Sequence, residues 1–118
     1  MIAFLSLAFS AETRIQTIED LRSAVSTAAP GDILILEAGQ YTLDSTLNIT
    51  AAGTEAAPIT LRGEGATLLS NTVEAIKVSA PYWHFENLSM QGICADDSNC
   101  EHAFHLVGAA DGTWVQGC

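Results

Sequence analysis

The amino-acid sequence predicts an all-β solenoid, a parallel β-helix whose coils stack on one another. Three observations carry this prediction, and the first two are that one short strand-like unit recurs along the chain and that a second strand-like pattern recurs beside it. An amphipathic helix ahead of the strands is the third. A repeat of about 20 to 50 residues is typical of solenoids, because each coil can bury its apolar edge only against the next coil.

The recurring unit is a run of alternating apolar and polar residues that stops at a small or turn-forming residue, as short half-buried strands do. The run begins at Leu34, Ile59, Trp83 and Thr113, so the first two steps are nearly equal and the third is longer. The longer step contains the polar segment 94–100, and removing about six residues there would restore the regular spacing. We therefore expect coils of nearly constant length with one insertion.

The second pattern supports the same interpretation. Segments 75–79 and 103–107 match in their order of apolar and polar residues, and they are separated by one coil plus part of the insertion. Because each coil then contributes two repeating strand positions, we expect two strands per coil, the minimum that a stacked parallel arrangement needs.

A single helix is predicted ahead of the first strand. Thr17 is suited to cap it, with Asp20 in the place of the usual glutamate of a capping box, and Pro30-Gly31 ends it. Its apolar residues recur at helical spacing on one face: Ile18, Leu21, Val25 and Ala28. Such a helix can lie across the open end of the first coil and cover it, as the cap of a solenoid must.

The rest of the chain alternates short strands with turns. Residues 33–36 are too few and too continuously apolar for a second helix, and glycines bound them on both sides. Alternation continues through residues 41–49, interrupted by a turn at Asp44-Ser45, and Pro58 stands at the head of a strand, where its missing N–H is tolerated. No linker divides the chain, which indicates one domain.

The repeat also predicts that this domain is incomplete. It offers only about three coils, near the lower limit for a self-sustaining stack. The last unit stops at Cys118, where the pattern of the preceding coil continues as Leu88-Ser89-Met90. We therefore expect residues 12–118 to be the N-terminal cap and first coils of a β-helix domain, truncated at its C-terminal end. The partner of this open end would be the remainder of the β-helix downstream of Cys118.

Residues 1–11 predict an export signal. They are apolar, too few to span a bilayer, and end in the small residues Ala8 and Ser10 before Glu12, although the usual charged n-region is missing. The alternative is an apolar tail that packs on the domain. An export signal would make the protein secreted or periplasmic.

The three cysteines agree with an oxidising compartment. Cys94 and Cys100 bracket a short polar loop, and we expect a disulfide bond between them. Cys118 is left over, and its partner would lie downstream in a longer chain.

The charge balance excludes two classes of partner. The formal net charge is −10, with 4 Lys and Arg against 14 Asp and Glu. Nucleic acids and anionic membranes are bound by clustered cations, and this sequence has no basic patch. We therefore predict no nucleic-acid partner and no membrane contact beyond the export signal. An acidic polymer would need divalent cations to bridge it to this part of the protein.

Two sets of residues are candidates for binding. The densest group of metal-ligating side chains comprises Asp96, Asp97, Glu101 and His102, with His105 nearby. The alternative is that this loop is acidic only because it is exposed to solvent, with His105 pointing outward while Phe104 and Leu106 point inward.

The candidates for carbohydrate binding are Tyr82 and Trp114, because an aromatic face packs well against the apolar face of a pyranose. Alternation places Trp83 and Phe85 on the inward side, where we expect them to pack in the core. Lys77 and Arg62 are the only cations of the strand region, at outward positions without a second cation at matching register. We assign no catalytic residue, since lone strand cations are as well explained by protection of an exposed sheet.

Four segments occur in an order that resembles a known family: the helix at 18–25, the element at 30–41, the strand entry at 53–61 and the strand at 83–88. The second contains Gly31-Asp32, a strand, and then Gly39 and Tyr41. Together they resemble the N-terminal portion of secreted right-handed parallel β-helix proteins, especially the chondroitinase B and alginate lyase type. The resemblance covers roughly residues 15 to 92 and bears on the fold more than on the activity.

The resemblance implies a substrate and a chemistry for the full-length protein. It implies a polysaccharide containing uronate, Ca²⁺ or an arginine that neutralises the uronate carboxylate, and a lysine that abstracts the proton at C5, all on later coils than this chain contains. The sequence thus supports two functions. One is the N-terminal part of a secreted polysaccharide lyase; the other is a non-catalytic extracellular β-helix that binds glycans or serves as a surface scaffold.

Overall fold

The structure is a computed structural model that describes residues 12–94 and 102–118. Within these ranges the chain is mostly β, with one helix, α1 (Ile18–Thr27). The predicted export signal, residues 1–11, lies outside the described residues. The strands are β1 (Glu12–Ile15), β2 (Ile33–Leu36), β3 (Gly39–Leu43), β4 (Leu47–Ile49), β5 (Ile59–Gly63), β6 (Ala66–Ser70), β7 (Glu74–Val78), β8 (Trp83–Glu86), β9 (Ser89–Gly92), β10 (His102–Leu106) and β11 (Trp114–Gln116).

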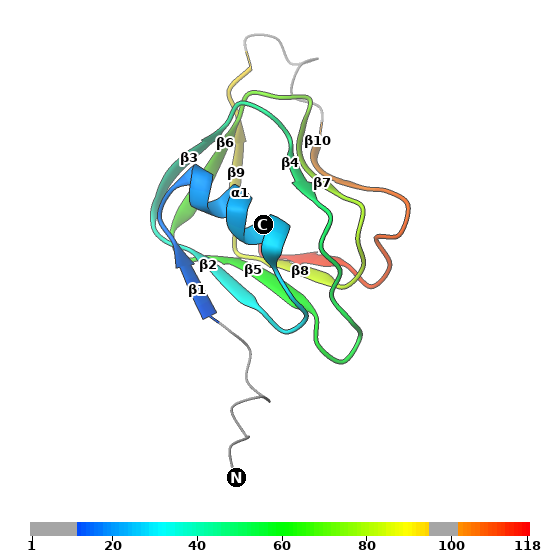
Figure 1. Ribbon diagram of the computed structural model, residues 1–118. Coiled ribbons are helices and arrows are strands. Elements are labelled where there is room, and N and C mark those ends of the chain that lie inside the picture. The colour runs from blue at the N-terminus through cyan, green and yellow to red at the C-terminus, as the bar shows by residue number, and fades with distance from the viewer. Residues whose placement is uncertain (1–11, 95–101) are drawn as a thin grey trace.

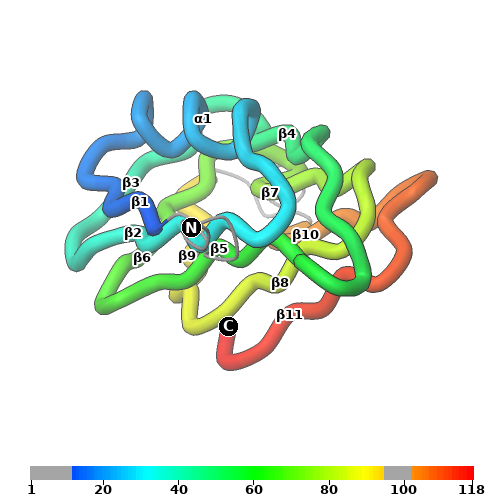
Figure 2. The backbone as a smooth tube through the Cα atoms, turned by 60° about the horizontal axis from the view of Figure 1, so that its bottom comes forward, coloured from blue at the N-terminus to red at the C-terminus, as the bar shows by residue number. Residues whose placement is uncertain are grey.

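The strands form three parallel sheets around a common core (Figure 1). The first sheet has the order β1-β2-β5-β8-β11, the second β3-β6-β9 and the third β4-β7-β10. Successive strands belong to the first, the second and the third sheet in turn, and the next strand belongs to the first sheet again. We call each set of three such strands a coil; the coils are β2–β4, β5–β7 and β8–β10. Figure 2 shows these coils lying one beneath the other, with α1 at one end of the stack.

Each coil has three strands, whereas the sequence pattern led us to expect two. The missed division falls within residues 41–49, where alternation continues on both sides of Asp44-Ser45. The chain bends at this point and moves from the second sheet to the third. Both strands bury their alternate residues, Tyr41 and Leu43 in β3, Leu47 and Ile49 in β4. The predicted turn at Asp44-Ser45 is confirmed, but because the inward alternation continues across it, periodicity did not show that the strands on its two sides belong to different sheets.

The strand registers confirm most of the predicted repeat. Ile59 pairs with Trp83, so the second predicted step is correct. The segment that begins at Thr113 pairs with the one that begins at Trp83, and segment 103–107 pairs with segment 75–79, both in the predicted alignment. The first step was wrong, because Leu34 pairs with Leu61 rather than Ile59. Ile59 and Leu61 both point inward, and a shift by two positions leaves the inward side of a strand unchanged.

The core is formed by the inward sides of the three sheets, and Trp83 and Phe85 lie at its centre. Both are completely buried, as predicted, with their rings stacked and 5.7 Å between the ring centroids. The indole Nε1 of Trp83 donates a hydrogen bond of 2.6 Å to the carbonyl oxygen of Ala51. Phe104, which lies on the third sheet, contacts Phe85, with 5.1 Å between the two ring centroids. The largest side chains thus fill the space between the sheets, where the core needs bulk.

The helix α1 lies across one end of the stack (Figure 1) and contacts the strands of the first coil. Its N-cap is Thr17, whose hydroxyl oxygen accepts a hydrogen bond from the backbone N–H of Asp20 at 3.1 Å, as predicted. Leu21 and Val25 are buried against the core. Arg22 donates to the carbonyl oxygens of residues 45 and 46, which ties the helix to the bend of the first coil.

One strand precedes the helix, which the sequence pattern did not predict. β1 pairs in parallel with β2 and lies at the end of the first sheet. Its four residues bury only Ile15, so the strand has too little alternation to be recognised by itself. Among the described residues, no helix is long and apolar enough to cross a membrane.

Candidate carbohydrate-binding face

The outer face of the first sheet carries polar and aromatic side chains that lie in register on successive coils. We call the outward side of β1, β2, β5, β8 and β11, together with the bend at Tyr82, the outer face. Two rows of register partners cross it. One row contains Glu12, Ile33, Thr60, His84 and Trp114, and the other contains Arg14, Ile35, Arg62, Glu86 and Gln116.

His84 and Trp114 are in ring contact on neighbouring coils. Their ring centroids are 3.9 Å apart and the ring planes are inclined by 31°. Trp114 nevertheless remains 36% exposed. Burial lowers the pKa of His84, and the nearby carboxylate of Glu86 opposes this only in part. The imidazole is therefore largely neutral at pH 7, with one ring nitrogen as a donor and the other as an acceptor.

Tyr82 lies at the bend that leads into β8, in an unusual backbone conformation. Its φ of 60° falls in the left-handed region, which is sparsely populated by residues other than glycine. Its N–H donates to the carbonyl oxygen of Asp111 at 2.8 Å, and its own carbonyl oxygen accepts from Ile59 at 3.0 Å. These two hydrogen bonds join three successive coils and hold the strained conformation.

The ring of Tyr82 is seated on Gly112. A Cβ atom at position 112 would overlap the Tyr82 ring, so only glycine allows the ring to lie there. Gly112 stands shortly before Trp114 on the same segment, which brings the two predicted carbohydrate-binding residues to the same end of the first sheet. Within the described ranges, neither the Tyr82 hydroxyl nor the His84 ring nitrogens make a hydrogen bond. These groups are thus available to a ligand.

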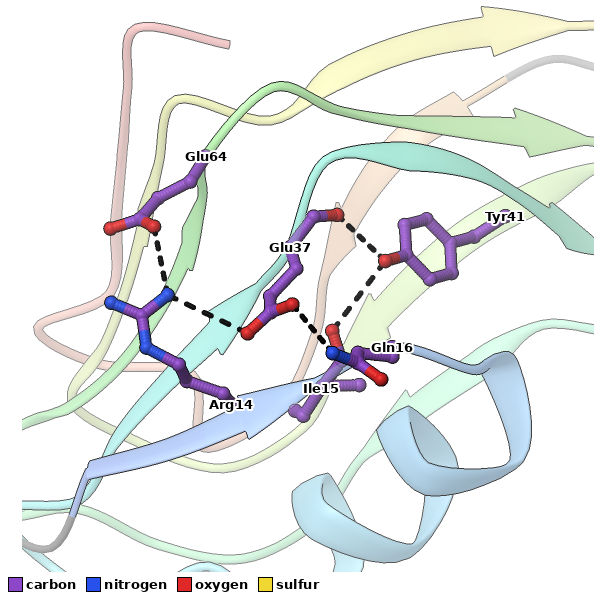
Figure 3. A network of polar contacts seen from close by, with 6 residues as sticks. All are labelled: Arg14, Ile15, Gln16, Glu37, Tyr41 and Glu64. Carbon is purple, nitrogen blue, oxygen red and sulfur yellow. Dashed lines mark hydrogen bonds and ion pairs between the residues drawn. The ribbon is translucent and has the colours of Figure 1, made fainter.

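The cations of the outer face are paired with glutamates. Arg62 Nε lies 2.9 Å from Glu86 Oε1, and both side chains are partly buried. Arg14 Nη1 lies 3.0 Å from Glu64 Oε1 and 3.7 Å from Glu37 Oε2, and the hydrogen bond to Glu64 raises the pKa of Arg14 (Figure 3). With two arginines against three glutamates, this part of the face has no positive charge to offer to an anionic polymer.

The pair at Arg14 belongs to a network that joins β1 to the first two coils (Figure 3). Gln16 Nε2 donates to Glu37 Oε1 at 2.8 Å. The hydroxyl of Tyr41 donates to the backbone oxygen of Glu37 at 2.6 Å, and burial raises the pKa of this hydroxyl group. Because these contacts hold the chain at the edge of the sheet, we interpret this network as structural.

Of the predicted metal ligands, only His102 is described; Asp96, Asp97 and Glu101 lie outside the described residues. His102 begins β10, and its ring centroid is 5.7 Å from that of His105. The Nδ1 atom of His105 pairs with the carboxylate of Glu74, and the His105 side chain is partly exposed, as expected for an outward position. The described residues bring no three metal-ligating side chains together. Cys100 is likewise outside them, so the bond between Cys94 and Cys100 stays a prediction.

A cavity of about 160 Å³ adjoins His102 at the corner between the second and third sheets. Its lining includes Ser70, Thr72, Met90 and Ala103. Since β9 and β10 end their sheets among the described strands, this space lies at the uncovered end of the stack.

The two strand cations lie on different sheets. Lys77 pairs in register with Asn48 and His105 on the third sheet, whereas Arg62 lies on the first. The pairs that the sequence analysis missed are His84 with Trp114 and Arg62 with Glu86. Each pair is separated in the sequence by one coil step, so comparing residues one step apart would have found both.

Comparisons with known proteins find a likeness at the level of the fold. No protein-family model matches the sequence, and no curated protein matches it significantly. Among solved structures, the chain is similar to a PL6 family alginate lyase, AlyGC, with a TM-score of 0.60 and 27% sequence identity. The match covers 73% of this chain and 12% of the lyase chain. The chain therefore matches only a small part of that protein's length, at the level of a shared fold.

Proposed function

We propose that this chain is the N-terminal cap and first coils of a right-handed parallel β-helix protein that acts on polysaccharide outside the cytoplasm. The observation that carries the proposal is the likeness to the PL6 family alginate lyase, which extends over most of the chain. The three parallel sheets, the constant visiting order of the strands and the helix over one end support the fold part of the proposal.

The favoured activity is that of a polysaccharide lyase acting on a uronate polymer such as alginate. In this reaction a base removes the proton beside the uronate carboxyl group, and a cation stabilises the negative charge that develops there. The described coils offer no free cation on the outer face, since Arg14 and Arg62 are paired. We therefore place the catalytic groups on further coils, with Ca²⁺ as the candidate cation.

The alternative is a non-catalytic β-helix that binds glycans or forms a surface scaffold. The observation that favours it is the same pairing of arginines, together with the separation of Lys77 from Arg62 on different sheets. Under this alternative, the outer face would bind polysaccharide without altering it.

The decisive experiment incubates the full-length protein with alginate and, separately, with chondroitin sulfate in the presence of Ca²⁺. A lyase leaves unsaturated uronate ends, so the ultraviolet absorbance should rise with time. A flat trace for both polymers would remove the lyase activity for these substrates. Retardation of the protein in a gel containing the same polymer would then support the binding alternative, and unaltered mobility would remove polysaccharide binding as well.

Export can be tested on the same protein. The first described strand begins at Glu12, directly after the predicted cleavage site, so removal of residues 1–11 would leave the sheet intact. N-terminal sequencing of protein recovered from the medium or periplasm should start at Glu12. Recovery of uncleaved protein from the cytoplasm alone would contradict the proposal and favour an apolar tail on the domain.

A further inference from the structure

We propose that Arg22, Asn48 and Lys77 form a binding site for the carboxylate of one uronate unit, on the outward side of the third sheet beside α1. This inference rests on the proposed polysaccharide function and gives it a ligand group and a place on the first two coils. It concerns binding alone, and no residue of the site is assigned a catalytic role.

The Lys and Arg residues of the chain differ in how their charge is balanced. Arg14 and Arg62 lie on the first sheet and form ion pairs with glutamates. Arg22 and Lys77 have no carboxylate within ion-pair distance among the described residues. Although the formal net charge of −10 opposes anions in general, these two side chains therefore keep a positive charge that is locally unbalanced.

Hydrogen bonds place Arg22 beside Asn48. The guanidinium Nη1 donates to the carbonyl oxygen of Thr46 at 3.2 Å, and Nη2 donates to that of Ser45 at 2.7 Å. The Nδ2 atom of Asn48 lies 3.5 Å from the same Thr46 oxygen. Because both side chains reach one oxygen atom, they lie side by side. These contacts use only part of the N–H donors of the guanidinium, so others remain for a ligand.

The strand register places Lys77 on the other side of Asn48. The two residues are partners in the parallel pairing of β4 with β7, and neighbouring strands lie about 4.8 Å apart. Both occupy outward positions, since Ile49 and Val78, which follow them, are buried. Asn48 is exposed and Lys77 is half-buried. The site thus presents a guanidinium, an amide and an ammonium group in that order.

These donors suit a carboxylate. Its two oxygen atoms together accept about four hydrogen bonds. One oxygen can accept from the unused N–H groups of Arg22 and the other from the ammonium group of Lys77, with the Asn48 amide as a neutral donor between them. Hydrogen bonds from cationic donors to a carboxylate are about twice as strong as those between neutral groups. A neutral sugar offers no group that would use both charges.

Two acidic residues stand close to the site in the sequence, and neither neutralises it. Glu74, on the same strand as Lys77, is paired with Nδ1 of His105. Asp44 precedes the bend that holds Arg22, and it makes no ion pair among the described residues. A uronate carboxylate here would meet two available cations, whereas on the first sheet it would meet arginines that are already paired.

The site does not depend on how far the stack extends. β4 is the first strand of the third sheet, and β7 lies between β4 and β10. α1 contacts β4 at the capped end of the stack (Figure 2). A further coil would pair with β10 and would leave the outward side of β4 and β7 open.

The test uses NMR on the full-length protein and two sugars that differ only in the carboxylate, methyl mannuronoside and methyl mannoside. Neither carries a sugar at O4, so a lyase cannot cleave them. Reductive methylation with ¹³C-formaldehyde labels lysine amines and keeps their charge. The signal that is lost in Lys77→Arg belongs to Lys77. At constant ionic strength, we expect this signal to shift saturably with methyl mannuronoside and to stay in place with methyl mannoside.

Two substitutions, each with a matched control, locate the binding through the Lys77 signal. Asn48→Asp puts a negative charge between the cations and should weaken binding of methyl mannuronoside by at least about tenfold. Gln40→Glu makes the same charge change at an exposed position of the second sheet and should change the dissociation constant by less than about twofold.

Arg22→Gln should weaken binding by about fivefold, because it removes one of the two cations. Arg14→Gln removes the same charge from the first sheet and should have an effect of less than about twofold. Thermal unfolding should confirm that each variant is folded. If the loss of the guanidinium unfolds the bend that it holds, Asn48→Asp with its control decides the question.

The outcomes separate this inference from the proposed function. If the Lys77 signal shifts equally with both sugars or with neither, or if Asn48→Asp and Gln40→Glu bind alike, the site is wrong. The polysaccharide function then stands as long as the protein binds or cleaves the polymers named above. If it does neither, the proposed function fails, and a shift of the Lys77 signal would report a carboxylate site without that function.

Discussion

The two ends of the stack differ in what covers them, although their strands carry the same inward pattern. At the first end, Ile49 lies under α1 and is buried. At the last end, Leu106 occupies the equivalent inward position, in line with Ile49 and Val78, yet it is 46% exposed. The first sheet shows the same difference. Val115 is in register with the buried Leu61 and Phe85, yet it is 41% exposed.

This difference teaches that burial in this fold is decided by the neighbouring coil and not by the strand. An apolar side chain of the size of leucine gains about 1.5–3 kcal/mol when it is fully buried, so the last coil leaves that stabilisation unused. Strands β9, β10 and β11 also end their sheets among the described strands, and free strand edges invite pairing. At the first end, α1 contacts the strands of the first coil and buries Leu21 and Val25 against the core.

The largest expected effect concerns association. Residues 12–118 expressed alone should self-associate or be poorly soluble, because the last coil exposes apolar side chains and strand edges. The double substitution Leu106→Lys with Val115→Lys should shift the protein toward monomer in sedimentation experiments. Val73→Lys is the control, with similar exposure but no inward position on the last coil. A monodisperse unsubstituted monomer with a cooperative thermal transition would contradict the view that the last coil is an uncovered surface.

A matched pair of leucine substitutions measures the comparison directly. Leu21→Ala, in the buried face of α1, should lower the free energy of unfolding by about 2–4 kcal/mol. Leu106→Ala should lower it by less than about 1 kcal/mol, since this side chain is already half exposed. Urea titrations measure both losses in the free energy of unfolding. If association interferes, both leucine substitutions are made in the Val115→Lys protein. Equal losses would show that the two ends are equally covered.

Loss of the helix cap should have an intermediate effect. Thr17→Ala removes the hydroxyl that accepts from the Asp20 N–H and should cost about 1 kcal/mol, whereas Thr17→Ser should retain most of the stability. Urea unfolding provides the measurement. If Thr17→Ser is as unstable as Thr17→Ala, the hydroxyl is not responsible.

The smallest expected effect is on the titration of His84. Its folded-state pKa lies below the ordinary value of 6.5, because the ring is partly desolvated, and Trp114 covers one side of it. Trp114→Ala should therefore raise the pKa toward 6.5, which NMR titration of the imidazole resonances would detect. Since the unfolded chain takes up its proton first, His84 lowers stability as the pH falls below 6.5 and has no such effect above it. An unchanged pKa in Trp114→Ala would separate the desolvation of His84 from Trp114.

Local sequence rules predicted much of the fold. The apolar alternation located most strands and the inward side of Trp83 and Phe85, and Thr17 with its apolar helix face predicted α1. The same rules failed for β1, which buries one residue, and they did not show that the strands on the two sides of the predicted turn at Asp44-Ser45 belong to different sheets. They also misplaced the register of Leu34 by two positions, because such a shift preserves the inward side.

The candidate face was predictable only in part. Tyr82 and Trp114 were recognised as outward aromatic residues, but the residues that contact their rings come from other coils. His84 lies a full coil step before Trp114, and Gly112, on which Tyr82 rests, is a glycine whose importance only the packing reveals. The pairing of Arg62 with Glu86 likewise joins residues that are distant in the sequence.

By itself, the sequence determined where the helix and most strands form and which of their residues face inward, because these depend on the side-chain pattern over a few consecutive residues. The tertiary structure alone decided how many sheets surround the core, which residues meet on the outer face, and which inward residues are covered. These properties depend on the lateral stacking of coils, where contacts join residues about one coil apart and where each coil's burial is completed by its neighbour.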